Sequence, residues 1–508
     1  MLFSEIARVF GSCSTSFPIL NTITGKDESS KIDLDVEVTG VCYDSRRVKS
    51  GDLFVAVQGG SFDGHEYIET ARKAGASAFI VEKNIPFLDE CNIPYIIVSD
   101  GRRAMGEAAA AFYDYPSRKL KLVGVTGTSG KTTVTHLIRA IFEANGIKAG
   151  FVGTLGAMAG DKPMPTEHTT PESADVQYLL AEMVKEGVEV VAMETSSHGL
   201  YQGRTHACEF DCGVFTNIAR DHLDFHETLE AYLDAKLILF RDYPPRSSKH
   251  FTGILNADDH AYVQVKEACA GDVLSFSVDG IGDLTASDVC AGTQTVDYTL
   301  SMNGTKSHIH LGIGGAFNVY NSLAAIGVAL TLGLNMEQIV AGLAQATCVP
   351  GRFESVDCGQ DFGVIVDYAH TPDELENVLN TASSLPHKHL IAVFGCGGDR
   401  DRGKRPIMGD IASDIADYTV VTSDNPRSEN PDTIIQEILK GIENNNMASV
   451  RVNPDRRGAI REAINMASSG DIVVIAGKGH EDYQILADRT IHFDDREVAR
   501  EILREMRS

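Results

Sequence analysis

A lysine and two threonines follow a glycine-rich turn at 124–133, in the order Gly-Val-Thr-Gly-Thr-Ser-Gly-Lys-Thr-Thr. Glycines let backbone N–H groups surround phosphate oxygens, a helix N-terminus adds a favourable dipole, Lys131 offsets negative charge, and Thr132 can coordinate Mg²⁺. Position 125 holds Val where the strict phosphate-loop pattern holds Gly, so this is a variant loop. We predict an ATP-binding loop, and not merely a glycine-rich turn, made of Gly127, Thr128, Ser129, Gly130, Lys131, Thr132 and Thr133.

Acidic and basic side chains that suit a phosphate site occur further along the chain. Glu194 directly follows the apolar run 188–193, and open α/β sheets bind their ligands at the carboxyl ends of strands. A carboxylate there suits Mg²⁺, which prefers oxygen ligands. His222 and Lys236 follow, the latter on a predicted helix at 229–240. Taken singly, Glu194 and Lys236 are of types more often found on a solvent-exposed surface, so position alone assigns them no role.

Strand-like apolar runs alternate with helical periodicity in two long stretches. In the first, strands are predicted at 120–125, 188–193, 212–216 and 253–255, with helices at 131–144, 174–185 and 229–240. In the second, strands are predicted at 363–366, 390–394, 418–422 and 471–476, with helices that start near Pro372, Pro406, Pro431 and Arg457. This alternation is typical of crossover units and parallel-rich sheets.

The segments outside these stretches complete the predicted architecture. Short runs at 53–57, 78–81 and 95–98 and a helix at 103–113 predict a small mixed unit, while polar alternation at 293–312 indicates antiparallel strands before a helix at 317–334. At roughly 150 residues per domain, the chain fits about three domains. We predict the α/β class with a small mixed α/β N-terminal domain (1–116), a central parallel-rich ATPase domain with the variant phosphate loop (117–349), and a Rossmann-like α/β C-terminal domain (350–508).

The composition excludes several classes of partner. Lys and Arg number 45 against 71 Asp and Glu, which gives a formal net charge of −26, and such a surface repels nucleic acid and anionic lipid. We therefore expect no nucleic acid and no membrane as a partner. No apolar stretch reaches the about 18 residues of a membrane-spanning helix, no basic start followed by an apolar block marks a signal peptide, and the ten cysteines contain no CxxC pair. These features predict a cytoplasmic protein with reduced cysteines.

Eleven short segments occur in order along nearly the whole chain. They are TGTSGKTT at 126–133, TTPE at 169–172, METSSHGL at 193–200, NIARDHLDFH at 217–226, ILNADD at 254–259, GAFNVYNSLAA at 315–325, PGRFE at 350–354, VDYAHTPD at 366–373, GCGGDRDRGKRP at 395–406, DNPR at 424–427 and AGKGHEDYQ at 476–484. Together they resemble the Mur ligase family, ATP-dependent enzymes that add amino acids to the peptidoglycan precursor. Within it the chain looks like the members that attach the third residue to UDP-N-acetylmuramoyl-L-alanyl-D-glutamate.

The resemblance implies ligation through an acyl phosphate, with ATP as co-substrate and Mg²⁺ as cofactor. The side-chain carboxylate of the D-Glu residue would attack the γ-phosphate of ATP, and the amine of the acceptor would then displace phosphate. Phosphorylation supplies the leaving group that a carboxylate lacks, and cations offset the charge where two anions meet. The implied partners are small-molecule substrates, and we expect a monomer.

By the same resemblance, the catalytic and metal-binding residues surround the phosphate loop. Lys131 would contact the β- and γ-phosphates, while Thr132 and Glu194 would hold one Mg²⁺. His222 would help to hold a second metal ion. Lys236 matches a lysine that the family carbamylates, a change that converts a cation into an anion.

The remaining ATP contacts and the sugar-nucleotide contacts come from several segments. The resemblance assigns Asn318, Arg352 and Asp367 to the nucleotide, although for Asn318 alone a helix N-cap is an equal or better interpretation. The residues that it assigns to the muramoyl dipeptide are Ser45, Thr169, Thr170, Ser196, Gln202 and Arg204.

The choice of acceptor depends on the tetrapeptide Asp-Asn-Pro-Arg at 424–427, which follows the predicted strand at 418–422. Asn-Pro is also a common turn, so the tetrapeptide alone indicates nothing more. In the family it resembles enzymes that add meso-diaminopimelate, whose distal carboxylate a guanidinium such as that of Arg427 can bind through two hydrogen bonds. The residues assigned to this acceptor are Arg400, Asp424, Asn425, Pro426, Arg427, Gly477 and Glu481.

Two alternatives stay open at this point. A related ligase could add L-lysine or another amino acid, as lysine-adding and folylpolyglutamate-type enzymes do, although the METSSHGL and DNPR segments weigh against this. A non-enzymatic ligase-like subunit could lose the catalytic residues, but here Lys131, Thr132, Glu194, His222 and Lys236 are all present.

Overall fold

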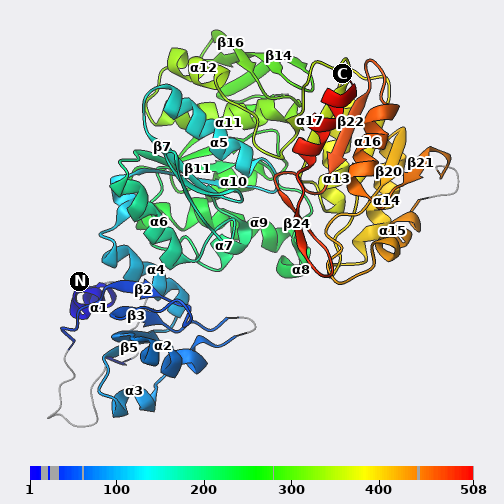
Figure 1. Ribbon diagram of the computed structural model, residues 1–508. Coiled ribbons are helices and arrows are strands. Elements are labelled where there is room, and N and C mark those ends of the chain that lie inside the picture. Colours follow the sequence, from blue (N-terminus) through cyan, green and yellow to red (C-terminus); the bar gives the residue numbers. More distant parts are fainter. Residues whose placement is uncertain (13–20, 23–33, 60–61, 279, 443–446, 507–508) are drawn as a thin grey trace.

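The computed structural model describes residues 1–12, 21–22, 34–59, 62–278, 280–442 and 447–506. Its three larger sheets follow one another along the chain, and each carries its own helices (Figure 1). The N-terminal part, blue in Figure 1, and the C-terminal part, yellow to red, both lie against the central part. The α/β class with three parts is confirmed. Each sheet falls inside one of the predicted domains, whose boundaries stay predictions.

The N-terminal sheet has five strands, in the order β1 (Asn21–Thr22), β5 (Tyr95–Ile97), β4 (Ala78–Val81), β3 (Asp52–Val55) and β2 (Gly40–Cys42). Strands β2 to β5 are parallel and β1 is antiparallel. The helices of this part are α1 (Phe3–Ser12), α2 (Ile68–Ala74), α3 (Pro86–Glu90) and α4 (Gly101–Phe112). Helix α4 begins two residues before the predicted start because the Asp100 carboxylate caps it, accepting from Arg103 N at 3.0 Å.

The central sheet has eleven strands. Its middle is parallel and consists, in spatial order, of β7 (Ala149–Gly153), β10 (Val190–Glu194), β6 (Lys121–Thr126), β11 (Cys212–Phe215), β12 (Thr252–Asn256), β13 (Asp272–Ser277) and β14 (Leu284–Ala291). Its margins are antiparallel and consist of β8 (Gly156–Ala159) and β9 (Lys162–Met164) on one side and β15 (Val296–Met302) and β16 (Thr305–Leu311) on the other. The antiparallel strands predicted at 293–312 are present as β15 and β16.

Helices cover both faces of the central sheet. They are α5 (Lys131–Ala144), α6 (Ser173–Lys185), α7 (Ser197–Tyr201), α8 (Leu223–His226), α9 (Leu229–Arg241), α10 (Tyr262–Ala268), α11 (Phe317–Thr331) and α12 (Met336–Ala344). Because side chains alternate along a strand, Val123 and Val125 of β6 join the apolar core under α5, α11 and α12, while Leu122 joins the core under α6 and α9. This two-sided burial explains why β6 is a continuous apolar run.

The C-terminal sheet has the order β17 (Glu354–Ser355), β18 (Gly363–Asp367), β22 (Ile472–Ala476), β19 (Leu390–Phe394), β20 (Tyr418–Val421) and β21 (Val450–Val452), with only β17 antiparallel. Its helices are α13 (Pro372–Ser384), α14 (Lys404–Ile415), α15 (Pro431–Leu439), α16 (Arg456–Met466) and α17 (Asp495–Met506), and β23 (Tyr483–Ile485) pairs with β24 (Thr490–His492) in a separate hairpin. The four predicted strands and the four predicted helices are confirmed, although Pro406 is the third residue of α14 and not the first.

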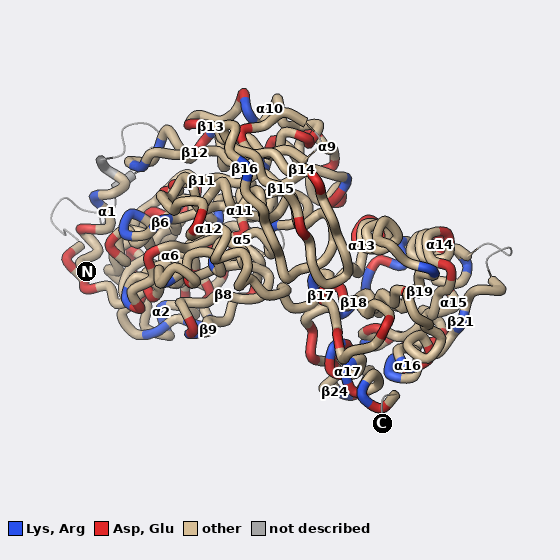
Figure 2. The backbone as a smooth tube through the Cα atoms, turned by 90° about the horizontal axis from the view of Figure 1, so that it is seen from above, with Lys and Arg blue, Asp and Glu red and all other residues tan. Residues whose placement is uncertain are grey.

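The strand register brings the candidate residues to one edge of the central sheet. Glu194 at the end of β10 pairs with Val125 of β6, and Phe215 at the end of β11 pairs with Thr126. The phosphate loop, Glu194 and the segment after β11 therefore leave the sheet side by side. Charged residues of both signs are interspersed over the molecule (Figure 2). Among the described residues, no helix is both long and apolar enough to cross a membrane.

Candidate active site

The phosphate loop connects β6 to α5 through two glycines in the left-handed region. Gly127 has a φ of 146° and Gly130 a φ of 88°, and a Cβ on Gly127 would lie 1.9 Å from Thr216 Oγ1. Glycine is therefore required at position 127. Helix α5 begins at Lys131 and no described side chain caps its first turn, so its N-terminal N–H groups are available to an anion.

Two lysines from different helices meet on one carbonyl of this loop. Lys131 Nζ donates to Gly127 O at 3.0 Å and to Thr128 O at 2.7 Å, and Lys236 Nζ on α9 donates to Gly127 O at 2.8 Å. Lys236 is only 1% exposed. Burial and the positive charge of Lys131 lower the pKa of Lys236 well below its ordinary value, which favours an uncharged, nucleophilic amine.

Glu194 is buried at the end of β10 with a fixed carboxylate. It accepts from the Thr154 backbone N–H at 3.0 Å and from the Thr154 hydroxyl at 3.2 Å. A Cβ on Gly153 would lie 2.1 Å from Glu194 Oε1, so glycine makes room for this carboxylate. Burial lowers the pKa of Lys131, and the negative charge of Glu194 opposes that effect.

The oxygen ligands at this edge fit Mg²⁺. Thr132 lies in the first turn of α5, next to Lys131, and Glu194 lies on the neighbouring strand. No group of three or more His, Cys, Asp or Glu side chains in the described part of the chain could hold a metal ion. A hydroxyl and one carboxylate nevertheless suit this cation, because Mg²⁺ is often bound by one or two carboxylates together with substrate phosphates.

His222 lies beside the lysines, at the start of α8. Its backbone is left-handed, with a φ of 53°, and its ring centroid is 4.8 Å from that of His198 and 5.9 Å from that of Tyr232. Burial is the largest influence that lowers the pKa of His222, and the charges of Lys131 and Lys236 lower it further. The imidazole is therefore kept uncharged, as a metal ligand must be.

The residues assigned to the nucleotide outside the loop come from α11 and the C-terminal part. Asn318 is the second residue of α11, where its Nδ2 donates to Gly314 O at 2.6 Å. The N-cap position is held by Ala316, so the alternative interpretation of Asn318 as an N-cap is wrong. Arg352 lies with its guanidinium carbon 5.2 Å from the Tyr368 ring centroid, and its charge acts on Lys131.

Asp367 ends β18 and accepts from Phe353 N at 2.7 Å and from Ala369 N at 2.8 Å. Burial raises the pKa of this carboxyl, while Arg352 and the two N–H groups oppose the effect. Asp367 thus fixes the segment that carries Arg352.

Four of the six residues assigned to the muramoyl dipeptide are linked by hydrogen bonds to Glu194 or to residues that contact it, and a fifth, Gln202, follows α7. Thr170 Oγ1 donates to Glu194 O at 2.9 Å and accepts from Ser196 N at 3.0 Å. Thr169 Oγ1 lies 3.1 Å from Thr154 Oγ1, and Arg204 Nη1 donates to Thr170 O at 3.0 Å. Gln202 follows α7 directly, and its Oε1 is buried without a hydrogen-bond partner among the described residues.

The sixth, Ser45, lines a separate cavity of about 400 Å³ on the N-terminal part. Its wall also includes Tyr43, Asp44, Arg46, Phe62, Tyr67, Arg102 and Glu172. Glu172 lies 3.0 Å from Arg102 Nη1 and 3.2 Å from Arg204 Nε. An ionic contact thus connects this cavity to the residues beside Glu194, although the sequence analysis assigned no role to Arg102 or Glu172.

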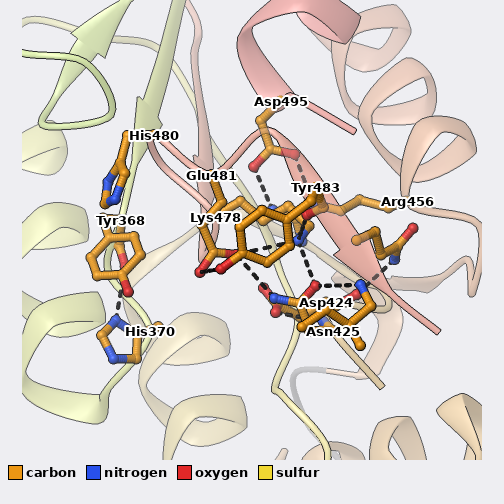
Figure 3. A network of polar contacts seen from close by, with 12 residues as sticks. Tyr368, His370, Asp424, Asn425, Arg456, Lys478, His480, Glu481, Tyr483 and Asp495 are labelled. Atoms are coloured by element: carbon orange, nitrogen blue, oxygen red, sulfur yellow. Dashed lines mark hydrogen bonds and ion pairs between the residues drawn. The ribbon is translucent and has the colours of Figure 1, made fainter. Parts of the chain in front are cut away.

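All the residues assigned to the acceptor except Arg400 lie on loops after β20 and β22, the strands on either side of β19, and Arg400 lies on the loop after β19 itself. Asn425 Nδ2 donates to Glu481 Oε2 at 2.9 Å, which ties the two loops together (Figure 3). Gly477 has a φ of 121°, and a Cβ there would lie 2.7 Å from Asp424 Oδ2. The loops therefore pack too closely for any other residue at position 477.

Arginines lie at the rim of these loops. Arg427, with a φ of 51°, donates from Nη1 to Gly398 O at 2.9 Å. Arg400 is exposed and donates to Asp399 O at 3.2 Å. Pro426 lies close to the same segment, because a Cβ on Gly398 would be 1.9 Å from Pro426 O. The 395–400 segment thus supports the arginine end of the acceptor loops.

A second cavity of about 400 Å³ joins the central and C-terminal parts. Its lining includes Thr154 and Thr169 from the central part and Tyr368, His480, Glu481 and Tyr483 from the C-terminal part. Residues assigned to the dipeptide and to the acceptor therefore share one space. Tyr368 and His480 lay inside two of the matched segments, but their residue types alone gave no reason to select them.

An imidazole–carboxylate pair stabilises the N-terminus of α13, next to this cavity. His370 Nδ1 lies 3.1 Å from Glu374 Oε2. Burial acts against both charges, but the contact outweighs it: the pKa of Glu374 falls to about 2 and the pKa of His370 rises. The contribution of Glu374 is lost as the pH falls through its folded pKa, and that of His370 is lost as the pH rises through its own.

Replacing His370 with asparagine should therefore destabilise the protein more near about pH 5.5 than near about pH 9. Because both side chains are partly exposed, the difference should be about 1 kcal/mol or less. Urea unfolding at the two pH values measures it, with Glu374→Gln as the matched variant. Equal destabilisation at both pH values would show that the contribution of His370 to stability does not depend on its positive charge.

The comparisons with known proteins agree over most of the chain. Family profiles described as "Mur ligase family, catalytic domain", "Mur ligase middle domain" and "Mur ligase, glutamate ligase domain" match residues 37–113, 125–329 and 351–479. A relative from Clostridium acetobutylicum, named UDP-N-acetylmuramoyl-L-alanyl-D-glutamate--2,6-diaminopimelate ligase 1, is 43% identical over 476 residues, 93% of this chain and 96% of that protein. The chain belongs to the Mur ligase family.

Other relatives of this Mur ligase extend the comparison. A Clostridium botulinum protein with the same name, without the final number, is 44% identical over 475 residues, 92% of this chain and 96% of that protein. A solved structure of a UDP-N-acetylmuramoyl-L-alanyl-D-glutamate--2,6-diaminopimelate ligase matches with a TM-score of 0.69 and 32% identity over 93% of this chain and 96% of that one.

A folylpolyglutamate synthase from Mycobacterium tuberculosis complexed with ADP matches with a TM-score of 0.59 and 18% identity, over 73% of this chain and 91% of that one. At this identity it shares the fold alone. The predicted family and fold class of this Mur ligase are confirmed.

Proposed function

We propose that this Mur ligase joins meso-diaminopimelate to the D-Glu side chain of UDP-N-acetylmuramoyl-L-alanyl-D-glutamate, with ATP converted to ADP and phosphate, in cell wall synthesis. The observation that carries the proposal is the cavity that Thr169 and Glu481 both line. It would let an acyl donor and an amine acceptor meet between the central and C-terminal parts. The relatives that match almost the whole chain carry the name of this activity.

The reaction divides between the residues of the two parts. A D-Glu carboxylate oxygen attacks the γ-phosphorus, the bond to the β-phosphate oxygen breaks, and an acyl phosphate and ADP form. The acceptor amine then attacks the acyl carbon, loses a proton, and phosphate leaves. Lys131 offsets charge on the transferring phosphoryl group, with Asn318, Arg352 and Asp367 around the nucleotide. Mg²⁺ held by Thr132 and Glu194, with a second ion near His222, would supply further positive charge.

Lys236 is proposed to act as a carbamate. Its low-pKa amine can attack CO₂, forming an N–C bond and losing a proton, which leaves one negative charge. Carbamylation would convert one of the two lysine side chains that meet on Gly127 O into an anion. It would also place an anion next to His222, which suits a site that holds cations.

The acceptor is proposed to bind by its distal end between opposite charges. Meso-diaminopimelate carries an ammonium and a carboxylate there, whereas lysine carries only the ammonium. Glu481 would face the ammonium, and Arg427 the carboxylate, with Arg400, Asp424, Asn425, Pro426 and Gly477 completing the site. The dipeptide would contact Thr169, Thr170, Ser196, Gln202 and Arg204, and its uridine end would contact Ser45.

An acceptor panel tests this proposal. Purified protein with ATP, Mg²⁺ and the UDP-linked dipeptide is given meso-diaminopimelate, its LL isomer, L-lysine or D-glutamate, and ADP release is measured. We expect the highest kcat/KM with meso-diaminopimelate. A preference for lysine would replace the proposed acceptor, and no turnover with any of them would reject the ligase function.

Arg427→Ala should lower kcat/KM for meso-diaminopimelate by about 10- to 150-fold, because a hydrogen bond to a charged group is worth roughly 1.5–3 kcal/mol. The KM for ATP should stay unchanged. Arg461→Ala, on the exposed side of α16, is the matched control and should behave as the unmodified protein. Unchanged kinetics with Arg427→Ala would remove this arginine from the acceptor site.

The cellular location and the assembly state are also proposals. The substrates are ATP and a sugar nucleotide, so we propose that the protein works in the cytoplasm. We expect it to be a monomer, which sedimentation equilibrium would test.

A further inference from the structure

A buried lysine that the proposed mechanism does not use lies between the two acceptor loops. Lys478 follows β22 and its side chain is 0% exposed. Its Nζ donates to Asn425 Oδ1 at 2.9 Å and to Tyr483 O at 2.7 Å, and it lies 3.5 Å from Glu481 Oε2. Figure 3 shows Lys478 at the centre of this network. A buried ammonium is retained only when it is paired and hydrogen-bonded.

The surroundings of Lys478 offset only part of the cost of burying it. Burial lowers the pKa of Lys478, whereas the charges of Asp424 and Glu481 raise it and that of Arg456 lowers it further. Arg456 and Asp495, both fully buried, form their own ion pair at 2.6 Å. The carboxylate in direct contact with Lys478 is therefore that of Glu481.

Lys478 also determines how Asn425 is oriented. An ammonium can only donate hydrogen bonds, so the amide oxygen of Asn425 must face Lys478. The Ile485 backbone N–H donates to the same oxygen at 2.9 Å. The amide nitrogen is therefore directed at Glu481 Oε2, to which it donates at 2.9 Å. Glu481 lines the cavity shared with the dipeptide residues. Its Oε2 is held by Asn425 and Lys478, and its Oε1 accepts only a long hydrogen bond, 3.4 Å, from the hydroxyl of Tyr483, which lines the same cavity.

We propose that Lys478 is a positioning residue for the acceptor, which acts by fixing Asn425 and Glu481 in the orientation that receives the distal ammonium of meso-diaminopimelate. This inference rests on the proposed function, in which Glu481 meets that ammonium. It assigns Lys478 no contact with the reacting atoms. Its removal should therefore affect binding of one substrate and leave the chemical step largely intact.

The test is the steady-state kinetics of Lys478→Met, which keeps the length of the side chain and removes its charge. The KM for meso-diaminopimelate should rise at least about tenfold, the loss of one charged hydrogen bond. We expect kcat and the KM values for ATP and the UDP-linked dipeptide to change less than about threefold, since the phosphate site is untouched. Lys478→Arg should recover part of the loss, and the exposed Lys440→Met is the matched control.

A double-mutant cycle separates positioning from a merely structural role. If Lys478 acts through Glu481, the double variant Lys478→Met with Glu481→Gln should be little worse than Glu481→Gln alone. The inference would be overturned if the effects of the two substitutions on the KM for meso-diaminopimelate multiplied in the double variant. It would also be overturned if the KM values for all three substrates rose equally. If Lys478→Met does not fold, Asn425→Leu takes its place, because it removes the amide through which Lys478 acts. The same rise in the KM for meso-diaminopimelate is expected.

A wrong role for Lys478 can be distinguished from a wrong proposed function. If the unmodified protein does not ligate meso-diaminopimelate, the function is wrong. If it does, and Lys478→Met keeps the same KM for that acceptor, only the role of Lys478 is wrong.

Discussion

Replacing Lys131 with methionine is expected to lower kcat for ADP release by at least about 100-fold, the usual cost of removing one group that stabilises a developing charge. Lys131 is the first residue of α5, and its ammonium lies on the carbonyls of the loop that would hold the phosphates. It is also the cation closest in sequence to Thr132, a proposed Mg²⁺ ligand. In the Lys131→Met variant, the phosphoryl group being transferred would lose the main positive charge that the protein places beside it.

Lys306→Met provides the matched control, because Lys306 is exposed on β16. Both variants should unfold at the same temperature as the unmodified protein, within error. A kcat within about threefold of the original for Lys131→Met would place phosphate transfer elsewhere in the molecule.

Replacing Lys236 should be almost as damaging, and the pattern across substitutions reports the reason. Lys236→Gln and Lys236→Arg should each lose about 100-fold or more in kcat. Arginine keeps the positive charge but cannot form the carbamate, so it should not rescue activity. Mass spectrometry of the intact protein without substitutions should detect the mass of one added CO₂, which both variants should lack.

Removal of bicarbonate and CO₂ from the buffer provides an independent measurement. It should lower the activity of the unmodified protein and leave the variants as they are. A fully active Lys236→Arg variant would show that a buried positive charge is what matters, and would contradict the carbamate.

The parts of the site that lie on regular elements could be predicted from the sequence. Helix 131–144 appears with the predicted bounds, since a glycine turn before it and a strong apolar period within it both mark its start. Glu194 was expected at a strand end and lies there. These positions follow from local pattern alone, because strand and helix periods differ.

The supporting residues could not be predicted because they depend on contacts across the chain. Thr154 holds the Glu194 carboxylate from a position 40 residues away, after the glycine-rich strand β7, whose pattern is too weak to predict. Arg456 and Asp495 pair across 39 residues, and neither type nor spacing marks them. For Asn318 the residue type was misleading: it suits an N-cap, but Asn318 is the second residue of α11, and its amide donates to Gly314 O in the segment before the helix.

The fate of the carboxylate oxygens tests the central claim, that this ligase activates the D-Glu carboxylate as an acyl phosphate before amide formation. The UDP-linked dipeptide is prepared with oxygen-18 in both oxygens of that carboxylate and incubated with ATP, meso-diaminopimelate and the protein. The mass of the released phosphate is then measured. We predict that each phosphate carries one labelled oxygen, because the C–O bond breaks when the amine displaces phosphate. Product formation with unlabelled phosphate would contradict the account.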